Sequence, residues 1–115
     1  MKNNRVLSER RIESSVAKKA VELGYLTYKF TSPSNRGVPD RIFINKKGDI
    51  FFIEFKSLSG KVSPLQKMVF SKLLARKAVV YLVNNIQSGV DILKNNIDKI
   101  SGTATFESLY VPEIT

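Results

Sequence analysis

The segment PDRIFINKKGDIFFIEFK, residues 39–56, decides the fold of this chain. It holds two runs of apolar and β-favouring residues, 41–45 and 50–55, joined by the turn-forming segment 46–49. This arrangement predicts a β-hairpin. The second run is strongly apolar, which is typical of an interior strand that is covered on both faces.

The residues before the hairpin predict a helix, a strand and a loop. Ser8 can cap a helix over residues 9–23, where apolar side chains recur at helical spacing, and Gly24 is a suitable stop. Residues 25–30 are rich in aromatic and β-favouring side chains and predict a strand. Residues 31–38 are turn-forming and predict a loop.

The residues after the hairpin predict two more helices with a strand between them. Ser63 and Pro64 form a strong helix start, and Gln66 completes a Ser-x-x-Gln capping box. Residues 78–83 are almost wholly apolar and predict a short buried strand. Apolar side chains at helical spacing over residues 90–100 predict a third helix.

The order of elements, α-β-β-β-α-β-α, predicts an α/β fold with a mixed central sheet flanked by helices. A chain of 115 residues has the length of one domain with one core. We therefore expect a single domain over residues 1–115, with a core at about 8–100 and a C-terminal tail at 101–115.

Composition narrows the possible chemistry. The chain has no cysteine and no histidine, which excludes disulfides, thiolate or histidine-ligated metal sites, and nucleophilic sites that need a histidine base. Its net charge of +9 favours a polyanionic partner, above all nucleic acid, over a basic protein with no such partner. No targeting segment is recognisable, and no apolar run approaches the roughly 20 residues of a membrane span. We therefore expect a cytoplasmic protein.

Two carboxylates and a lysine are expected to meet at one end of the hairpin. Glu54 and Lys56 share a face because strand side chains alternate, and hairpin pairing would bring Asp40 close to Glu54. Neighbouring carboxylates raise each other's pKa, and a hard divalent cation such as Mg²⁺ can offset their repulsion. The alternative interpretation is an ordinary solvated Glu–Lys pair.

Three sequence blocks resemble the virus-type replication–repair nuclease domain, VRR-NUC, a branch of the PD-(D/E)XK nuclease superfamily. These blocks are RGVPDR at residues 36–41, IEFK at 53–56 and GKVSPLQ at 60–66, and the resemblance runs from about Glu13 to Val83. It implies a restriction-endonuclease-like core and a stand-alone nuclease domain of the viral or phage type.

The resemblance also implies roles for individual residues. Asp40 and Glu54 would be metal-ligand carboxylates, the backbone carbonyl of Phe55 a further ligand, and Lys56 the active-site lysine. Glu13 would complete the metal shell, with one or two Mg²⁺ or Mn²⁺ ions expected. The alternative for Glu13 is a solvated helix charge.

Gln66 matches the glutamine that follows Ser-Pro-Leu in the family, which implies a place in the catalytic site. Its alternative role is the capping box, and the two roles are compatible. Phosphate contacts are expected from a cluster of basic residues as a whole, since the alternative for each member alone is a solvated surface charge. The candidate DNA-binding residues are Arg10, Arg11, Arg36, Arg41, Lys61 and Lys67.

The implied function is a metal-dependent endonuclease that hydrolyses phosphodiester bonds in branched DNA such as four-way (Holliday) junctions. The alternatives are a nucleic-acid-binding module without catalysis and a flap- or nick-directed repair nuclease. Symmetric resolution of a junction takes two cuts, so we expect a homodimer. The apolar residues of the tail could form its interface or pack on their own domain; they are Phe106, Leu109, Tyr110, Val111 and Ile114.

Overall fold

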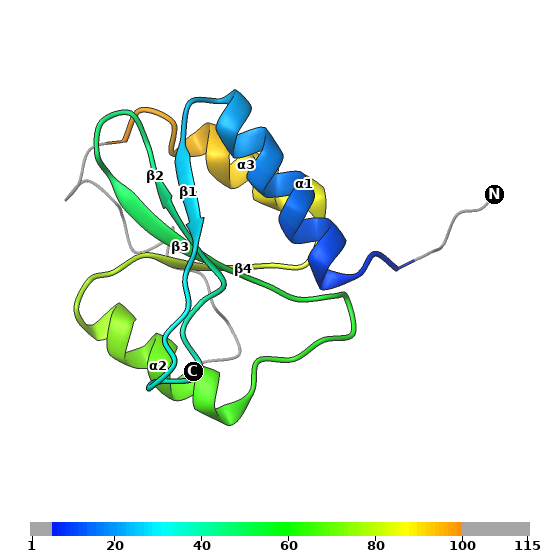
Figure 1. The fold of residues 1–115 in the computed structure, drawn as a ribbon, viewed down its shortest axis with the longest axis vertical. Coiled ribbons are helices and arrows are strands. Elements are labelled where there is room, and N and C mark those ends of the chain that lie inside the picture. The colour runs from blue at the N-terminus through cyan, green and yellow to red at the C-terminus, as the bar shows by residue number, and fades with distance from the viewer. Residues whose placement is uncertain (1–5, 100–115) are drawn as a thin grey trace.

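The computed structural model describes residues 6–99 and has the predicted order of helices and strands (Figure 1). Within this described part of the chain, four strands form one sheet, and three helices cover its two faces. The elements are α1 (Glu9–Glu22), β1 (Leu26–Lys29), β2 (Arg41–Ile44), β3 (Ile50–Phe55), α2 (Pro64–Ala75), β4 (Val80–Val83) and α3 (Ile86–Asn95).

The sheet is mixed, with strand order β1-β2-β3-β4. β1–β2 and β2–β3 are antiparallel pairs, and β3 pairs in parallel with β4 through the crossover helix α2. In the hairpin register Arg41 lies opposite Ile53, so the residue before Arg41 is level with the residue after Ile53. The predicted hairpin is confirmed, and its register brings the start of β2 to the end of β3.

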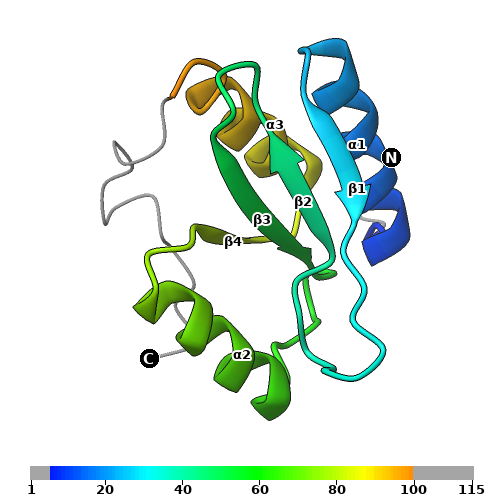
Figure 2. The ribbon, with the colours of Figure 1, turned by 60° about the vertical axis from the view of Figure 1, so that its left-hand side comes forward.

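The two faces of the sheet are covered differently. α1 and α3 lie side by side on one face, and α2 lies on the other (Figure 2). The larger core packs under α1 and α3, whereas a smaller cluster around Phe70 lies under α2. The larger core contains Ile12, Val16, Ala20, Tyr25, Phe43, Phe51, Ile53, Phe55, Tyr81, Val83 and Leu93.

Alternation along β3 divides its side chains between these faces. Phe51, Ile53 and Phe55 point into the larger core, and Phe52 packs with the cluster under α2. Glu54 shares the α2 face with Phe52 because it is two residues further along the strand.

α1 and α3 pack closely because Gly89 lies at their contact. A Cβ atom at Gly89 would come within 2.5 Å of Val16 Cγ2 on α1. Only glycine leaves room for this approach, so Gly89 fixes how α1 sits over the sheet.

Several predicted boundaries were wrong. α1, β1, β2 and β4 differ from their predicted ranges by one or two residues, and the third helix differs most. The third helix begins earlier than its apolar pattern suggested, because Asn85 caps it by accepting a hydrogen bond from the Ser88 N–H, and it ends before Ile97. β1 begins after Tyr25, whose side chain is buried and donates a hydrogen bond to the Leu93 carbonyl. Ile100 and the predicted apolar tail lie outside the described residues. Within residues 6–99 no helix is both long and apolar enough to cross a membrane.

Candidate active site

The end of β3 and the start of β2 bring Asp40, Glu54 and Lys56 together. Asp40 Oδ2 accepts a hydrogen bond of 2.8 Å from the Phe55 backbone N–H, which ties the loop before β2 to the last residue of β3. Lys56 Nζ lies 3.2 Å from Glu54 Oε2, so the two side chains share a face as alternation predicts. The lysine side chain is only 14% exposed. These three groups form a compact, partly buried ionic cluster.

The loop that leads into Asp40 is held against α2. Gly37 has a positive φ of 93°, and a Cβ atom there would lie 3.1 Å from side-chain atoms of Leu65 and Val69. Pro39, two residues on, is fully buried. Packing on α2 therefore positions this loop, and with it the carboxylate of Asp40.

Glu54 is the most buried member of the cluster, with its side chain 3% exposed. Its Oε2 accepts hydrogen bonds from Lys56 and from Gln66 Nε2, the latter at 2.8 Å. Its Oε1 is buried without a hydrogen-bond partner among the described residues. Burial, and then the charge of Asp40, raise the pKa of Glu54 to about 7, although Lys56 and Gln66 act in the opposite direction.

The carboxyl group of Asp40, like that of Glu54, has a raised pKa. Burial raises its pKa, the hydrogen bond from Phe55 opposes this, and the charge of Glu13 raises it further. Lys29 and Lys56 both lower the pKa of Asp40, whereas Lys56 is the lysine that acts on Glu54. Among residues 6–99, no group donates a hydrogen bond to Glu54 Oε1. This donor set fits a hard divalent cation, which would supply the missing positive charge and occupy the free oxygen lone pairs.

The protein ligands available for such a cation are few. Among residues 6–99, no three Asp, Glu, His or Cys side chains lie close enough together to form a metal-binding cluster. Mg²⁺ commonly binds through one or two carboxylates and keeps several waters or substrate oxygens. Asp40 and Glu54 meet that requirement, and the Phe55 backbone lies beside them.

Gln66 makes the contacts of both of its predicted roles. Its backbone N–H donates to Ser63 Oγ and its Oε1 accepts from the Ser63 N–H, so the capping box is confirmed. The other end of the same amide, Nε2, donates to Glu54. The capping box therefore orients this side chain toward the carboxylate cluster.

Glu13 lies on α1, where the larger core meets the same end of the sheet. It is buried rather than solvated, and its Oε2 accepts from Arg41 Nε at 2.8 Å and lies 2.9 Å from Lys29 Nζ. Arg41, a predicted DNA contact, is thus engaged inside the protein. Lys29 was missed by sequence reasoning, because nothing in its local sequence indicates a partner on α1.

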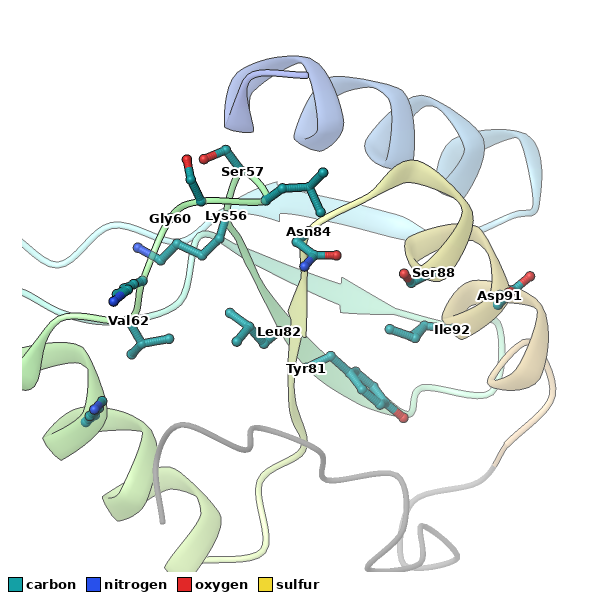
Figure 3. A pocket seen from close by; sticks show the side chains of 14 residues that line it. Lys56, Ser57, Gly60, Val62, Tyr81, Leu82, Asn84, Ser88, Asp91 and Ile92 are labelled. Carbon is teal, nitrogen blue, oxygen red and sulfur yellow. The ribbon is translucent and has the colours of Figure 1, made fainter. Parts of the chain in front are cut away.

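The remaining predicted DNA contacts divide into two groups. Lys61 and Lys67 are exposed and line one pocket together with Lys56 (Figure 3). Arg10, Arg11 and Arg36 are exposed elsewhere on α1 and on the loop before β2, and they do not line that pocket.

Comparison with known proteins places this arrangement in a family. A scan against protein-family models finds no match. The chain is 37% identical over 71 residues to "Putative nuclease p44" of Acyrthosiphon pisum secondary endosymbiont phage 1; the match covers 62% of this chain and 76% of that protein. A solved structure described as a VRR_NUC domain superposes with a TM-score of 0.69 at 25% identity, over 75% of this chain and 94% of the other.

The fold and the sequence likeness agree. The mixed four-stranded sheet with three helices is a restriction-endonuclease-like fold, and the phage relative matches over most of its own length. The chain therefore belongs to the VRR-NUC family of nucleases.

Proposed function

We propose that this protein is a metal-dependent endonuclease that hydrolyses phosphodiester bonds of DNA, as one nuclease domain over residues 1–115. The observation that carries the proposal is the buried carboxylate of Glu54 beside Asp40. Lys56 and Gln66 hold its Oε2, and no described residue is a hydrogen-bond partner of its Oε1. A non-catalytic binding module has no use for a costly buried carboxylate pair. Membership of a nuclease family gives independent support.

Asp40, Glu54 and the Phe55 carbonyl would hold Mg²⁺ or Mn²⁺, with Glu13 approaching from α1. When bound, such an ion polarises the scissile phosphate and lowers the pKa of a bound water. Other groups of the chain would hold these carboxylates in position. The Phe55 N–H fixes Asp40, and Gln66 fixes Oε2 of Glu54 so that Oε1 stays available.

Lys56 would stabilise the charge that develops on the phosphate and position the attacking water. Its ammonium lies 3.2 Å from Glu54 Oε2, and its charge lowers the pKa of Asp40. An ammonium group beside the scissile phosphate would stabilise the negative charge of the transition state. We therefore assign Lys56 an electrostatic role.

The substrate we propose is branched DNA, with a four-way junction as the leading form. The net charge of +9 supports binding to a polyanion, and no base-reading motif is present, so recognition would be through backbone and shape. With roughly five phosphate contacts, log K would fall against log salt with a slope of about −4 to −5. The phage relative is consistent with action in the cytoplasm of a host cell.

The test is cleavage of labelled four-way junction, flap and linear duplex with Mg²⁺, with Mn²⁺ and with EDTA. We expect metal-dependent cutting, strongest on the junction. Preference for the flap would favour a repair nuclease, whereas tight binding with no cutting in either metal would leave a binding module.

We also propose a homodimer, because two sites related by a two-fold axis match the symmetry of a four-way junction. Light scattering at micromolar concentration would then give about twice the chain mass of 13.0 kDa. A mass near 13.0 kDa both with and without junction DNA would rule out the dimer.

A further inference from the structure

A pocket of about 1100 Å³ opens beside Lys56 along the edge strand β4 (Figure 3). One wall is the loop between β3 and α2, residues 57–62, and the other is the start of α3. Pockets of roughly 300–1000 Å³ hold drug-sized ligands, so this one has room for a nucleotide. It begins at a residue of the proposed active site, so a ligand in it would lie next to the scissile phosphate.

The two ends of the pocket differ in charge. Lys56, Lys61 and Lys67 lie toward the β3–α2 loop and α2, and no carboxylate of residues 6–99 forms an ion pair with Lys61 or Lys67. Asp91 lies at the opposite end, where its Oδ1 accepts a hydrogen bond from Gln87. A phosphate would therefore bind at the lysine end and be repelled at the Asp91 end.

Between these ends the lining is apolar, with hydrogen-bonding groups above it. Leu82 lies at the centre of the pocket, and Val62 is buried beside it (Figure 3). Asn84, in the β4–α3 connection, presents an amide, and Ser88, in the first turn of α3, presents a hydroxyl. An apolar floor with polar groups at its rim suits the face and edge of a nucleobase.

Leu58 adds an exposed apolar side chain at the mouth of the pocket. It lies in the β3–α2 loop and is 62% exposed, although leucine gains free energy by leaving water. Apolar side chains such as leucine act as wedges between bases in proteins that unstack DNA. Leu58 is placed to do this one loop away from Lys56.

We propose that this pocket receives an unpaired nucleotide of the strand that flanks the scissile phosphate. Its phosphate would contact Lys61 and Lys67, its base would lie on Leu82 under Leu58, and the base edge would face Asn84 and Asp91. A base that stays paired and stacked in continuous duplex cannot enter a pocket, so cleavage would require a nucleotide that can leave the base stack at the cut, as at a branch point. The proposal rests on the proposed nuclease function and names the feature of DNA that its site selects.

The test compares affinities for a duplex that carries one single-stranded branch and for a continuous duplex of the same length, measured by fluorescence anisotropy in EDTA. Wild-type protein should prefer the branched DNA. Leu58→Ala should reduce this preference about fivefold, which corresponds to about 1 kcal/mol of lost contact. Leu26→Ala is the matched control, because Leu26 is 56% exposed on β1 and does not line the pocket.

A second pair of variants tests the phosphate end. Lys67→Ala and Lys72→Ala remove the same charge from the same helix, but only Lys67 lines the pocket. We expect Lys67→Ala to weaken branched-DNA binding more than Lys72→Ala. Equal loss in both members of each pair would overturn the proposal.

Cleavage by the same proteins separates the two hypotheses. If wild-type protein cuts branched DNA with metal and Leu58→Ala keeps the full preference, the pocket proposal falls and the nuclease proposal stands. If wild-type protein never cuts but Leu58→Ala alone loses the preference, the pocket proposal stands and the nuclease proposal falls.

Discussion

Two buried glutamates, Glu13 and Glu54, lie at the same end of the sheet and are treated very differently by their surroundings. Two positively charged side chains, Arg41 and Lys29, form ion pairs with the same oxygen of Glu13, Oε2. Glu54 has one lysine, Lys56, beside its Oε2, and within residues 6–99 its Oε1 has no hydrogen-bond donor. Their side chains are 12% and 3% exposed, so the more buried glutamate is the one with less compensation.

This contrast distinguishes a structural ion pair from a site that lacks a cation. A buried carboxylate that is paired with cations destabilises the fold little. A buried carboxylate with too few cationic partners destabilises the fold, so we expect it to be retained for a function such as metal binding. The pKa of Glu54 is raised accordingly, to about 7. Perturbed carboxylates of this kind are concentrated at functional sites.

The largest expected effect is loss of cleavage when residues of the cluster around Glu54 are replaced. Asp40→Asn and Lys56→Ala should each lower the cleavage rate about a thousandfold or more, because metal and charge stabilisation supply several kcal/mol of transition-state binding. Circular dichroism and DNA affinity should change little. Asp98→Asn, an exposed carboxylate beyond α3, is the control, and full activity in Asp40→Asn or Lys56→Ala would remove the site assignment.

Opposite changes in stability are expected from the two glutamates without metal. The pKa of Glu54 is raised from 4.5 to about 7 in the folded chain, so the folded state holds a proton there that the unfolded state releases. The free energy of unfolding therefore falls as pH rises from about 4.5 to 7 and stays lowered above, by at most about 3 kcal/mol. Glu54→Gln should restore this lost free energy of unfolding at pH 8 and should not increase the free energy of unfolding near pH 4.

Glu13→Gln should instead lower the free energy of unfolding at pH 8, by about 1–3 kcal/mol, because Arg41 and Lys29 lose their charged partner. Urea denaturation of both variants and wild-type protein in EDTA at pH 4 and pH 8 measures the difference. If Glu54→Gln and Glu13→Gln changed the free energy of unfolding in the same direction at pH 8, the proposed difference between the two glutamates would be wrong.

Metal addition should stabilise wild-type protein at pH 8. At a Mg²⁺ or Mn²⁺ concentration about tenfold above the dissociation constant, binding adds about 1.4 kcal/mol, which raises Tm by about 6 °C for a domain of this size. Glu54→Gln should lose most of this rise in a thermal scan. The same scan of Glu13→Gln decides its role, since an unchanged rise leaves Glu13 as an ion-pair partner only and a reduced rise adds it to the metal shell.

The smallest expected effect separates the two roles of Gln66. Ser63→Ala and Gln66→Ala both break the capping box, so each should lower the free energy of unfolding by about 1 kcal/mol. Only Gln66→Ala also removes the hydrogen bond to Glu54, and it alone should slow cleavage, about tenfold. Equal cleavage rates for the two variants, measured below their melting temperatures, would confine Gln66 to helix capping.

Local pattern was sufficient for the hairpin and its register. Residues 41–45 and 50–55 alternate or run apolar around a turn, and a slip of one residue would turn Glu54 toward the larger core, so the placement of Asp40 beside Glu54 follows from sequence. The capping role of Gln66 was equally readable, because the box needs only residues 63–66.

What escaped prediction depends on contacts between distant segments. The burial of Glu13 comes from the packing of α1 against β1 and β3, which no local spacing encodes. Its partners lie 16 and 28 residues away in the chain. The start of α3 was missed because the apolar pattern that predicted this helix begins only at Val90, whereas the helix is capped by Asn85. The pocket lies between the 57–62 loop and α3. It was not predicted because a periodic sequence pattern does not determine the conformation of a loop.

Phe55 links the carboxylate cluster to the interior through a single residue. Its ring is fully buried in the larger core, and its N–H holds the Asp40 carboxylate. Any loosening of the core around that ring would release Asp40 before a reactive group had changed, so the site and the core belong to one cooperative unit. Natural selection acting on catalysis would therefore also act on packing at Phe55, and drift at this position could not alter one property without the other.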